Sequence, residues 1–226
     1  HNQIKVAQLS GYVSEQTNYH HGEECLNQSI IKMSQSFVNS NNVPLLQNVG
    51  QFGSRSHAGK DSASPRYIFT KLGPLTSIIF NSLDNCLLKH AYDDGERVEF
   101  ENYVPIVPNV LINGMTAIGT GWSSNIPNFN LLHIIHKLKL LIANDIESFT
   151  MFQLKPYYHG FKGVIRQIND DSKKFVSEGI YDVKQMKNNK TIHVIREIPI
   201  DITIDSYKSF LESKLEKKEI KDLKNN

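Results

Sequence analysis

The sequence is poor in cysteine, low in net charge and without a long apolar run. Its two cysteines, Cys25 and Cys86, fit no C-x-x-C spacing, which argues against a disulfide scaffold and favours a reducing compartment. No stretch of roughly 18 or more apolar residues occurs, which predicts that no segment spans a membrane. The N-terminus has no apolar signal core, and because it also lacks a starting Met, we expect a piece of a longer chain.

Motifs for common cofactors are also missing. Five residues separate Gly53 from Gly59 where a phosphate loop has four, and Asp61 stands where Ser or Thr should follow the lysine. Residues 119–123 lack the third glycine of a dinucleotide fingerprint. Residues 93–95, Asp-Asp-Gly, predict a turn, and no D-x-D cluster with supporting carboxylates suggests a two-metal site.

The charge distribution is more informative than the net charge of +2. Residues 51–71 carry four formal positive charges against Asp61 alone, and the cations are Arg55, Lys60, Arg66 and Lys71. A local basic stretch of this kind is only weak evidence for a phosphate-bearing partner. The alternative is a loop whose charges are simply solvated.

Residues 24–38 predict an amphipathic helix. Apolar side chains recur at spacings of three and four, at Leu26, Ile30, Met33 and Phe37. The opposite face carries polar groups that could meet a DNA groove or water, namely Asn27, Gln28, Lys32 and Gln35. Residues 40–44, Ser-Asn-Asn-Val-Pro, are expected to stop the helix.

The following segment predicts a wing. Residues 49–64 are rich in Gly, Ser and charge, which indicates a long loop, and an extended piece at 66–70 and a helix at 75–88 follow. The order helix, helix, glycine-rich wing is typical of a winged helix-turn-helix module.

The rest of the chain predicts a second, α+β unit. Residues 103–112 read as an extended connector or edge strand, and residues 114–123 as a turn region. Asn130 is expected to cap an amphipathic helix over 131–142. After Pro156 the pattern predicts strands at 160–168, 174–183 and 191–200, then a helix at 206–218 with Asp205 as its N-cap.

Ser64-Pro65-Arg66-Tyr67 is the first candidate for chemistry. A phenol, with a pKa near ~10, is a poor nucleophile at neutral pH unless cations stabilise the phenolate and the charge of a developing phosphorane. Arg66 is adjacent and its fork suits phosphate oxygens, while Pro65 restricts the local backbone. Tyr67 is therefore a candidate covalent nucleophile. The alternative is that Tyr67, one of nine tyrosines, only packs.

The second candidate is residues 19–23, Tyr-His-His-Gly-Glu. Adjacent histidines before a helix could bind metal, shuttle a proton or donate to phosphate. A shared metal is disfavoured because neighbouring side chains diverge. Capping or plain surface positions are the alternative.

Several blocks of the sequence resemble eukaryotic-type DNA topoisomerase II in order and in spacing. They are residues 6–15, 19–23, 51–55, 59–70, 92–95 and 119–127. Together these blocks cover most of residues 4–130 and are very specific. From 131 to 226 the resemblance is weaker and rests on residues 160–163, Gly-Phe-Lys-Gly, and 196–199, Arg-Glu-Ile-Pro.

The resemblance implies an α+β fold, with a winged helix-turn-helix domain followed by a mixed α/β tower (shoulder) domain. The winged-helix DNA-cleavage domain would cover 1–106, and part of the tower domain would cover 107–226. The implied activity is ATP-dependent. A transient double-strand break is made through a 5′-phosphotyrosyl link, and a second duplex passes through it.

Site residues follow from the same resemblance. Tyr67 would form the phosphotyrosyl link, Arg66 would stabilise the transition state, and His21 would contact the region of the scissile phosphate. DNA contacts, mostly to the backbone, would come from Tyr19, His20, Cys25, Arg55 and Lys60. Cys25 departs from the small hydroxyl residue that the family often carries there. Ile118 falls where the family inserts an apolar wedge between base pairs to bend the DNA.

The resemblance also implies cofactors and partners. Mg²⁺ and ATP would both be bound by domains outside this segment, so the segment alone should not cleave DNA, and magnesium-dependent scission by it would contradict this. The partners would be double-stranded DNA and a second copy in a homodimer, with no membrane. The expected location is the nucleus, with a viral enzyme in a host cell as the alternative.

Two other classes of protein stay open. A non-catalytic winged-helix DNA-binding module would keep the scaffold, but it has no use for the positioned Arg66-Tyr67 pair. An α+β scaffold protein without nucleic acid would leave Ile118 and the basic loop unexplained. A salt series of DNA-binding assays separates the scaffold protein from the others, because phosphate contacts give a steep salt dependence.

Overall fold

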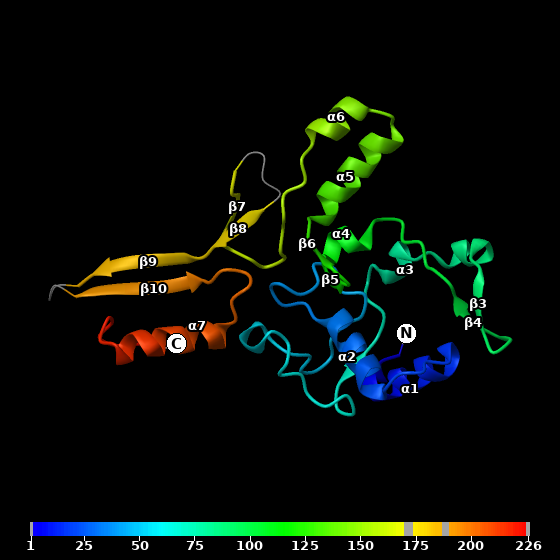
Figure 1. The fold of residues 1–226 in the computed structure, drawn as a ribbon, viewed down its shortest axis with the longest axis horizontal. Coiled ribbons are helices and arrows are strands. Elements are labelled where there is room, and N and C mark those ends of the chain that lie inside the picture. The colour runs from blue at the N-terminus through cyan, green and yellow to red at the C-terminus, as the bar shows by residue number, and fades with distance from the viewer. Residues whose placement is uncertain (1, 170–173, 187–189, 225–226) are drawn as a thin grey trace.

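The computed structural model describes residues 2–169, 174–186 and 190–224 as a mixed α+β chain. Helices α1 and α2 and the loops around them form a compact base, from which three arms project (Figure 1). One arm is the β3–β4 hairpin, the second is the helix pair α5–α6, and the third is β9, β10 and α7. The first and last residues of the two expected domains, His1 and Asn226, lie outside the described residues.

The base is organised around a small apolar core. Helix α1 (Val6–Thr17) and helix α2 (Glu23–Ser34) pack together, and strand β1 (Ile4–Lys5) pairs antiparallel with β2 (Phe69–Thr70). The core side chains are at most 2% exposed, and they are Val6, Ile30, Ile31, Phe52 and Ile68. The start of the chain is therefore bound to the segment that follows Tyr67.

The helix predicted at 24–38 is shorter, and part of its predicted polar face is wrong. Gln35 leaves the helix with an extended ψ of 139°, and its side-chain nitrogen donates to the carbonyls of Phe52 and Gly59 at 2.8 and 3.2 Å. Asn27 and Gln35, both expected on the polar face, are buried, whereas Met33 is 38% exposed. A tertiary hydrogen bond, not the local pattern, ends this helix.

The helix predicted at 75–88 is two short pieces, α3 (Thr76–Ile79) and the 3₁₀ helix η2 (Ser82–Leu87). Between them Phe80 leaves the helical region with ψ 89°, and the Asn81 side chain accepts from the Leu83 N–H at 3.0 Å to start η2. Strands β3 (His90–Asp93) and β4 (Glu96–Phe100) follow as a hairpin. The turn predicted at 93–95 is thus confirmed.

The predictions for 103–123 are only partly right. Helix α4 (Asn109–Asn113) replaces the end of the expected connector. The expected turn region is an antiparallel hairpin of β5 (Met115–Gly119) and β6 (Trp122–Ile126). Helix α5 (Leu131–Ile142) and its Asn130 cap are confirmed, with Leu132 N–H donating at 2.9 Å, and α6 (Ile146–Met151) follows.

The C-terminal strands form two further hairpins. Strand β7 (Val164–Gln167) pairs with β8 (Phe175–Glu178), and β9 (Ile180–Gln185) pairs with β10 (Thr191–Glu197). The single strand predicted at 174–183 is therefore split, at Gly179. Helix α7 (Ile204–Glu216) begins earlier than predicted because Thr203, not Asp205, caps it, accepting from the Ser206 N–H at 3.1 Å.

Asparagines join the base to the α4–α5 region. The Asn42 side-chain nitrogen lies 2.9–3.1 Å from the carbonyls of Ile112, Phe129 and Tyr157, and its oxygen accepts from the His159 N–H. Asn113 bonds both backbone groups of Val43 at 2.9 Å. Residues 40–44, predicted only to stop a helix, therefore also connect distant parts of the chain by hydrogen bonds.

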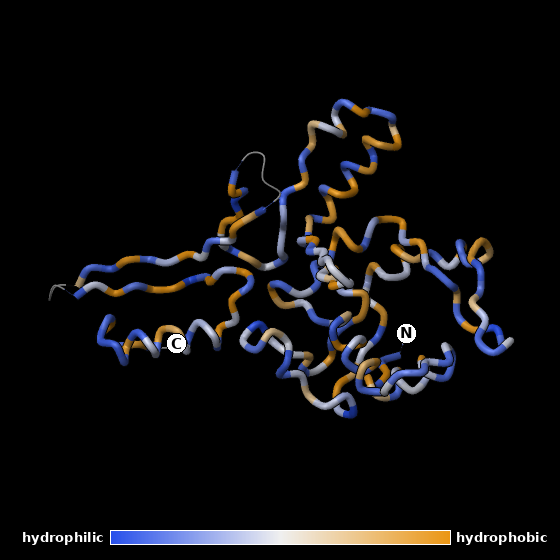
Figure 2. Tube along the Cα trace, in the orientation of Figure 1, coloured by the Kyte–Doolittle hydropathy of each residue, from blue (hydrophilic) through white to orange (hydrophobic). Residues whose placement is uncertain are grey.

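Along α5, apolar residues are interrupted by polar ones (Figure 2). Within the described ranges, no helix is both long enough and apolar enough to cross a membrane.

Candidate active site and nucleic-acid interface

Tyr67 lies on a backbone that is fixed on both sides. Its N–H closes a turn by donating to the Ser64 carbonyl at 2.9 Å, so the extended piece predicted at 66–70 begins later, at β2. The Pro65 carbonyl accepts from the Ala7 N–H at 3.1 Å, and the Ile68 carbonyl accepts from the Val6 N–H at 3.0 Å. Because the Ile68 side chain is buried in the core, the backbone is anchored on the C-terminal side of Tyr67.

The side chains of this turn point outward. Tyr67 is 75% exposed, and Arg66 is exposed beside it. Within the part of the chain that the structure describes, neither side chain has a hydrogen bond or ion pair. A rigidly mounted phenol at the surface does not act as a packing residue, which weakens that alternative.

The loop before Tyr67 is closed and tightly built. Phe52 anchors its start in the core, and the Ala63 N–H donates to the Gln51 carbonyl at 2.9 Å across its base. Gly53 and Gly59 both have positive φ, +97° and +80°, and their backbones touch. We call residues 51–63 the wing loop.

The acidic residue of the wing loop is turned inward. The Asp61 carboxylate accepts from the Ser54 hydroxyl at 2.7 Å and from its N–H at 2.8 Å. The Ser54 hydroxyl bond, against a smaller effect of burial, lowers the pKa of Asp61. Lys60 is exposed beside it. Lys60 is therefore accessible from solvent, whereas the Asp61 carboxylate is used in hydrogen bonds within the wing loop.

The substitution Gly53→Ala should collapse this arrangement. An added Cβ would lie 2.5 Å from the Gly59 carbonyl oxygen, on a residue with φ +97°. We expect a loss of about 2–3 kcal/mol in the free energy of unfolding, measured by urea denaturation. Gly11→Ala is the control, because nothing lies within 4 Å of that Cβ in α1, and it should stabilise by about 0.5–1 kcal/mol. Equal changes in the free energy of unfolding for Gly53→Ala and Gly11→Ala would contradict the close approach of Gly53 and Gly59.

Arg55 does not have the free guanidinium expected of a DNA contact. Its Nη1 donates to the Glu197 carboxylate at 2.5 Å, and its Nη2 donates to the Ile198 carbonyl at 2.8 Å. The Arg55 side chain is only 17% exposed. A charge run in the sequence does not reveal which of its members meets a buried carboxylate far along the chain.

The predicted residues of 19–25 lie between α1 and the start of α2. His20 Nε2 lies 2.8 Å from the Asp93 carboxylate of the β3–β4 hairpin, while the rings of Tyr19 and His21 meet edge-on at 5.4 Å. His21 and the Cys25 thiol are exposed. These positions are open to a ligand, except that His20 already has a carboxylate partner.

Ile118 lies near the tip of the β5–β6 hairpin, opposite Ser123. It is 87% exposed, and Trp122, next to the turn, is 75% exposed. Two large apolar side chains are thus exposed at the end of a narrow hairpin. Because Ile118 pairs with Ser123 and Trp122 pairs with Gly119, the register places Ile118 and Trp122 on opposite faces.

The structure joins some of the predicted residues and leaves others apart. Tyr67 and Arg66 share one turn and Lys60 precedes them on the wing loop. Among the described residues, no hydrogen bond, ion pair or ring contact links Tyr67 to His21 or Ile118. Sequence reasoning missed the residues that hold the site, which are Gln35, Asp61 and Glu197. Their partners are distant in sequence or lie within a loop, so no periodicity could reveal them.

Comparisons with known proteins show which proteins this chain resembles as a whole. The family model that describes the A subunit of DNA gyrase/topoisomerase IV matches residues 1–226. DNA topoisomerase 2-alpha of Cricetulus griseus is 47% identical over 206 residues, covering 91% of this chain and 13% of that protein. The mitochondrial DNA topoisomerase 2 of Dictyostelium discoideum is 44% identical over 220 residues, covering 97% and 16%.

A solved structure is also similar. The crystal structure of the Plasmodium falciparum topoisomerase II DNA-binding, cleavage and re-ligation domain matches with a TM-score of 0.88 and 41% identity. It covers 100% of this chain, which in turn spans 30% of that chain. Against the two curated relatives, the chain spans 13% and 16% of their length.

Proposed function

Because this chain belongs to the DNA gyrase/topoisomerase IV family, with close relatives among the eukaryotic type II topoisomerases, we propose that it is the DNA-cleaving segment of such an enzyme. Tyr67 is the nucleophile. The observation that carries the proposal is an exposed tyrosine and an exposed arginine on a turn whose backbone is anchored on both sides.

The chemistry is a reversible transesterification. The Tyr67 Oη attacks a DNA phosphorus, a P–Oη bond forms, and the P–O3′ bond breaks. The phenol gives up its proton and the leaving O3′ gains one, so the product is a 5′-phosphotyrosyl end and a free 3′-hydroxyl. Arg66 stabilises the charge that develops on the phosphate oxygens, His21 contacts the scissile phosphate region, and resealing is the reverse step.

The two-domain division is part of the proposal. Residues 1–106 form the winged-helix domain, with α1, α2 and the wing loop as its parts, and 107–226 belong to the tower. The DNA backbone would be held by Tyr19, His20, Cys25 and Lys60. We remove Arg55 from this set because its guanidinium is engaged with Glu197.

Cofactors and assembly are assigned to the longer protein. No cluster of three or more His, Cys, Asp or Glu side chains suited to a metal occurs within the described ranges. We propose that domains outside it bind Mg²⁺ and ATP and that the enzyme is a homodimer. Nuclear location stays a prediction, since one relative is named mitochondrial.

Adduct mapping tests the proposed function. The full-length protein is incubated with plasmid DNA, Mg²⁺ and ATP, quenched with detergent, digested and examined by mass spectrometry. We expect one nucleotide-bearing peptide, with the adduct on Tyr67, and none with the 226-residue chain alone. DNA binding without an adduct on any tyrosine would instead favour the non-catalytic binding module.

Ile118→Ala should weaken DNA bending. The exposed side chain would lose roughly 1–2 kcal/mol of apolar contact with the bases, so the bent fraction should fall about tenfold. Energy transfer between dyes at the two ends of a short duplex measures the bend. Ile142→Ala, at an 84% exposed position on α5, is the matched control and should change nothing. An unchanged bend in Ile118→Ala would remove the wedge role.

A further inference from the structure

The wing loop is joined to the C-terminal part of the chain by two contacts between ionisable side chains. Arg55 meets Glu197 at the end of β10, and His57 Nε2 lies 3.0 Å from the Asp205 carboxylate at the start of α7. We call Arg55, His57, Glu197 and Asp205 the latch. Its two sides are far apart in sequence, since Arg55 and Glu197 are separated by 142 positions.

Glu197 is the centre of the latch. Its side chain is 7% exposed, and its two oxygens also accept from the backbone N–H groups of Ile198 at 3.0 Å and Lys162 at 3.1 Å. Burial alone would raise the pKa of Glu197, but the bonds from Arg55 and the Lys162 N–H outweigh it and leave the pKa below its usual value. A buried carboxylate that loses its cation is strongly unfavourable, so the pair forms or breaks as a unit.

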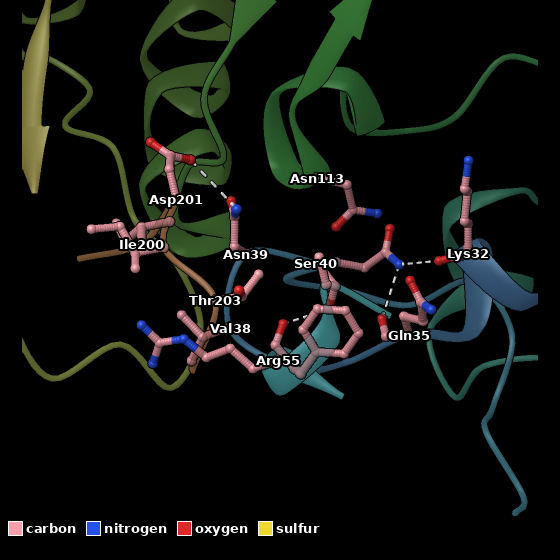
Figure 3. A pocket seen from close by; sticks show the side chains of 14 residues that line it. Lys32, Gln35, Val38, Asn39, Ser40, Arg55, Asn113, Ile200, Asp201 and Thr203 are labelled. Atoms are coloured by element: carbon pink, nitrogen blue, oxygen red, sulfur yellow. Dashed lines mark hydrogen bonds between the residues drawn. The ribbon is translucent and has the colours of Figure 1, made fainter. Parts of the chain in front are cut away.

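A cavity beside the latch makes these contacts matter more. It has a volume of about 310 Å³ and is lined by Arg55 and Ala58 of the wing loop, by residues 37–41 and by residues 200–203 (Figure 3). Across it, Asn39 and Asp201 are linked only by a long hydrogen bond of 3.5 Å. Arg55 thus lies where the two sides are separated by open space, and its contact with Glu197 links them.

The wing loop is directly connected to the turn that carries Tyr67. Gln35 holds both of its arms through the carbonyls of Phe52 and Gly59, and the Ala63–Gln51 hydrogen bond leads directly into the turn of Tyr67. On the basis of the proposed function, we propose that Glu197, acting through Arg55, is a positioning residue for Tyr67. The latch lets the C-terminal unit set the alignment of the nucleophile with the scissile phosphate.

The test is single-turnover DNA cleavage by the full-length protein carrying Glu197→Gln, with Arg55→Lys as a second variant. A misplaced nucleophile loses rate steeply, so we expect the cleavage rate constant at saturating DNA to fall about 10- to 100-fold, with the Kd for DNA changed less than about twofold. Arg196→Gln is the control. Arg196 lies on β10 next to Glu197, and this substitution breaks its exposed ion pair with Asp182 of β9. It should leave the rate constant unchanged.

A merely structural role would show a different pattern. It would lower the fraction of active enzyme, seen as the amplitude, while the rate constant of the remaining molecules stayed at the wild-type value. That result in both latch variants would overturn the proposal. An equal loss of rate in Arg196→Gln would overturn it as well.

A readout independent of cleavage separates this inference from the proposed function. If wild type forms no adduct on Tyr67, the proposed function fails, and hydrogen exchange in Glu197→Gln then tests the latch itself. Faster exchange at the amides of Gly59, Ala63 and Tyr67, with β9 and β10 unchanged, supports the mechanical link. Unchanged exchange in the wing loop refutes it.

Discussion

Tyr67→Phe is expected to eliminate the covalent DNA adduct completely while leaving DNA binding within about twofold of wild type. Phenylalanine keeps the ring and removes only the oxygen that attacks phosphorus, so no bond to DNA can form. Tyr67 is 75% exposed, so the fold loses nothing measurable and the free energy of unfolding should change by less than about 0.5 kcal/mol. Detergent-trapped complexes on a gel measure the adduct.

Tyr92→Phe is the matched control for this experiment. Tyr92 lies on the β3–β4 hairpin and is 69% exposed, so it loses the same group from a similarly accessible site. Its adduct yield should equal that of wild type. An adduct that survives Tyr67→Phe, or disappears only in Tyr92→Phe, would show that the nucleophile has been assigned to the wrong tyrosine.

Arg66→Gln is expected to lower the cleavage rate constant by about 10²–10³, the usual effect of removing one preorganised donor to a developing oxyanion. Arg66 is exposed and has no partner in the described chain, so its guanidinium is available to the phosphate and its loss leaves no internal group unsatisfied. Binding should weaken slightly, with the slope of log K against log salt reduced by about 0.9 for one lost phosphate contact. Single-turnover cleavage across a salt series measures both quantities.

Two further variants sharpen this result. Arg66→Lys keeps the charge but not the fork, and it should recover only part of the rate. Arg97→Gln removes another exposed arginine, on β4, and should leave the cleavage rate unaffected. If Arg66→Gln changed the salt slope without changing the rate at saturating DNA, Arg66 would be a binding residue and not part of the catalytic turn.

The sequence by itself determined the features that depend on neighbouring residues. The turn at 93–95 and the Asn130 cap of α5 were predictable because each is made by hydrogen bonds and backbone preferences within a few positions. Prediction failed where local and distant demands competed. Helix α2 ends at Ser34, and Gln35 bonds carbonyls of the wing loop. Thr203 caps α7 in place of Asp205, whose carboxylate lies 3.0 Å from His57 Nε2 of the distant wing loop.

For the candidate site, the motif around Arg66 and Tyr67 was legible in the sequence, together with the family resemblance that now rests on the matched relatives. Only the tertiary structure shows which hydrogen bonds hold the backbone of those residues and which cations have no carboxylate partner within the described part of the chain. Arg55 and Lys60 belong to one basic stretch, yet Arg55 meets Glu197 across the fold while Lys60 stays exposed. The physical reason is that a buried ion pair depends on desolvation and geometry at a contact between distant segments, which local patterns of charge and hydropathy do not encode.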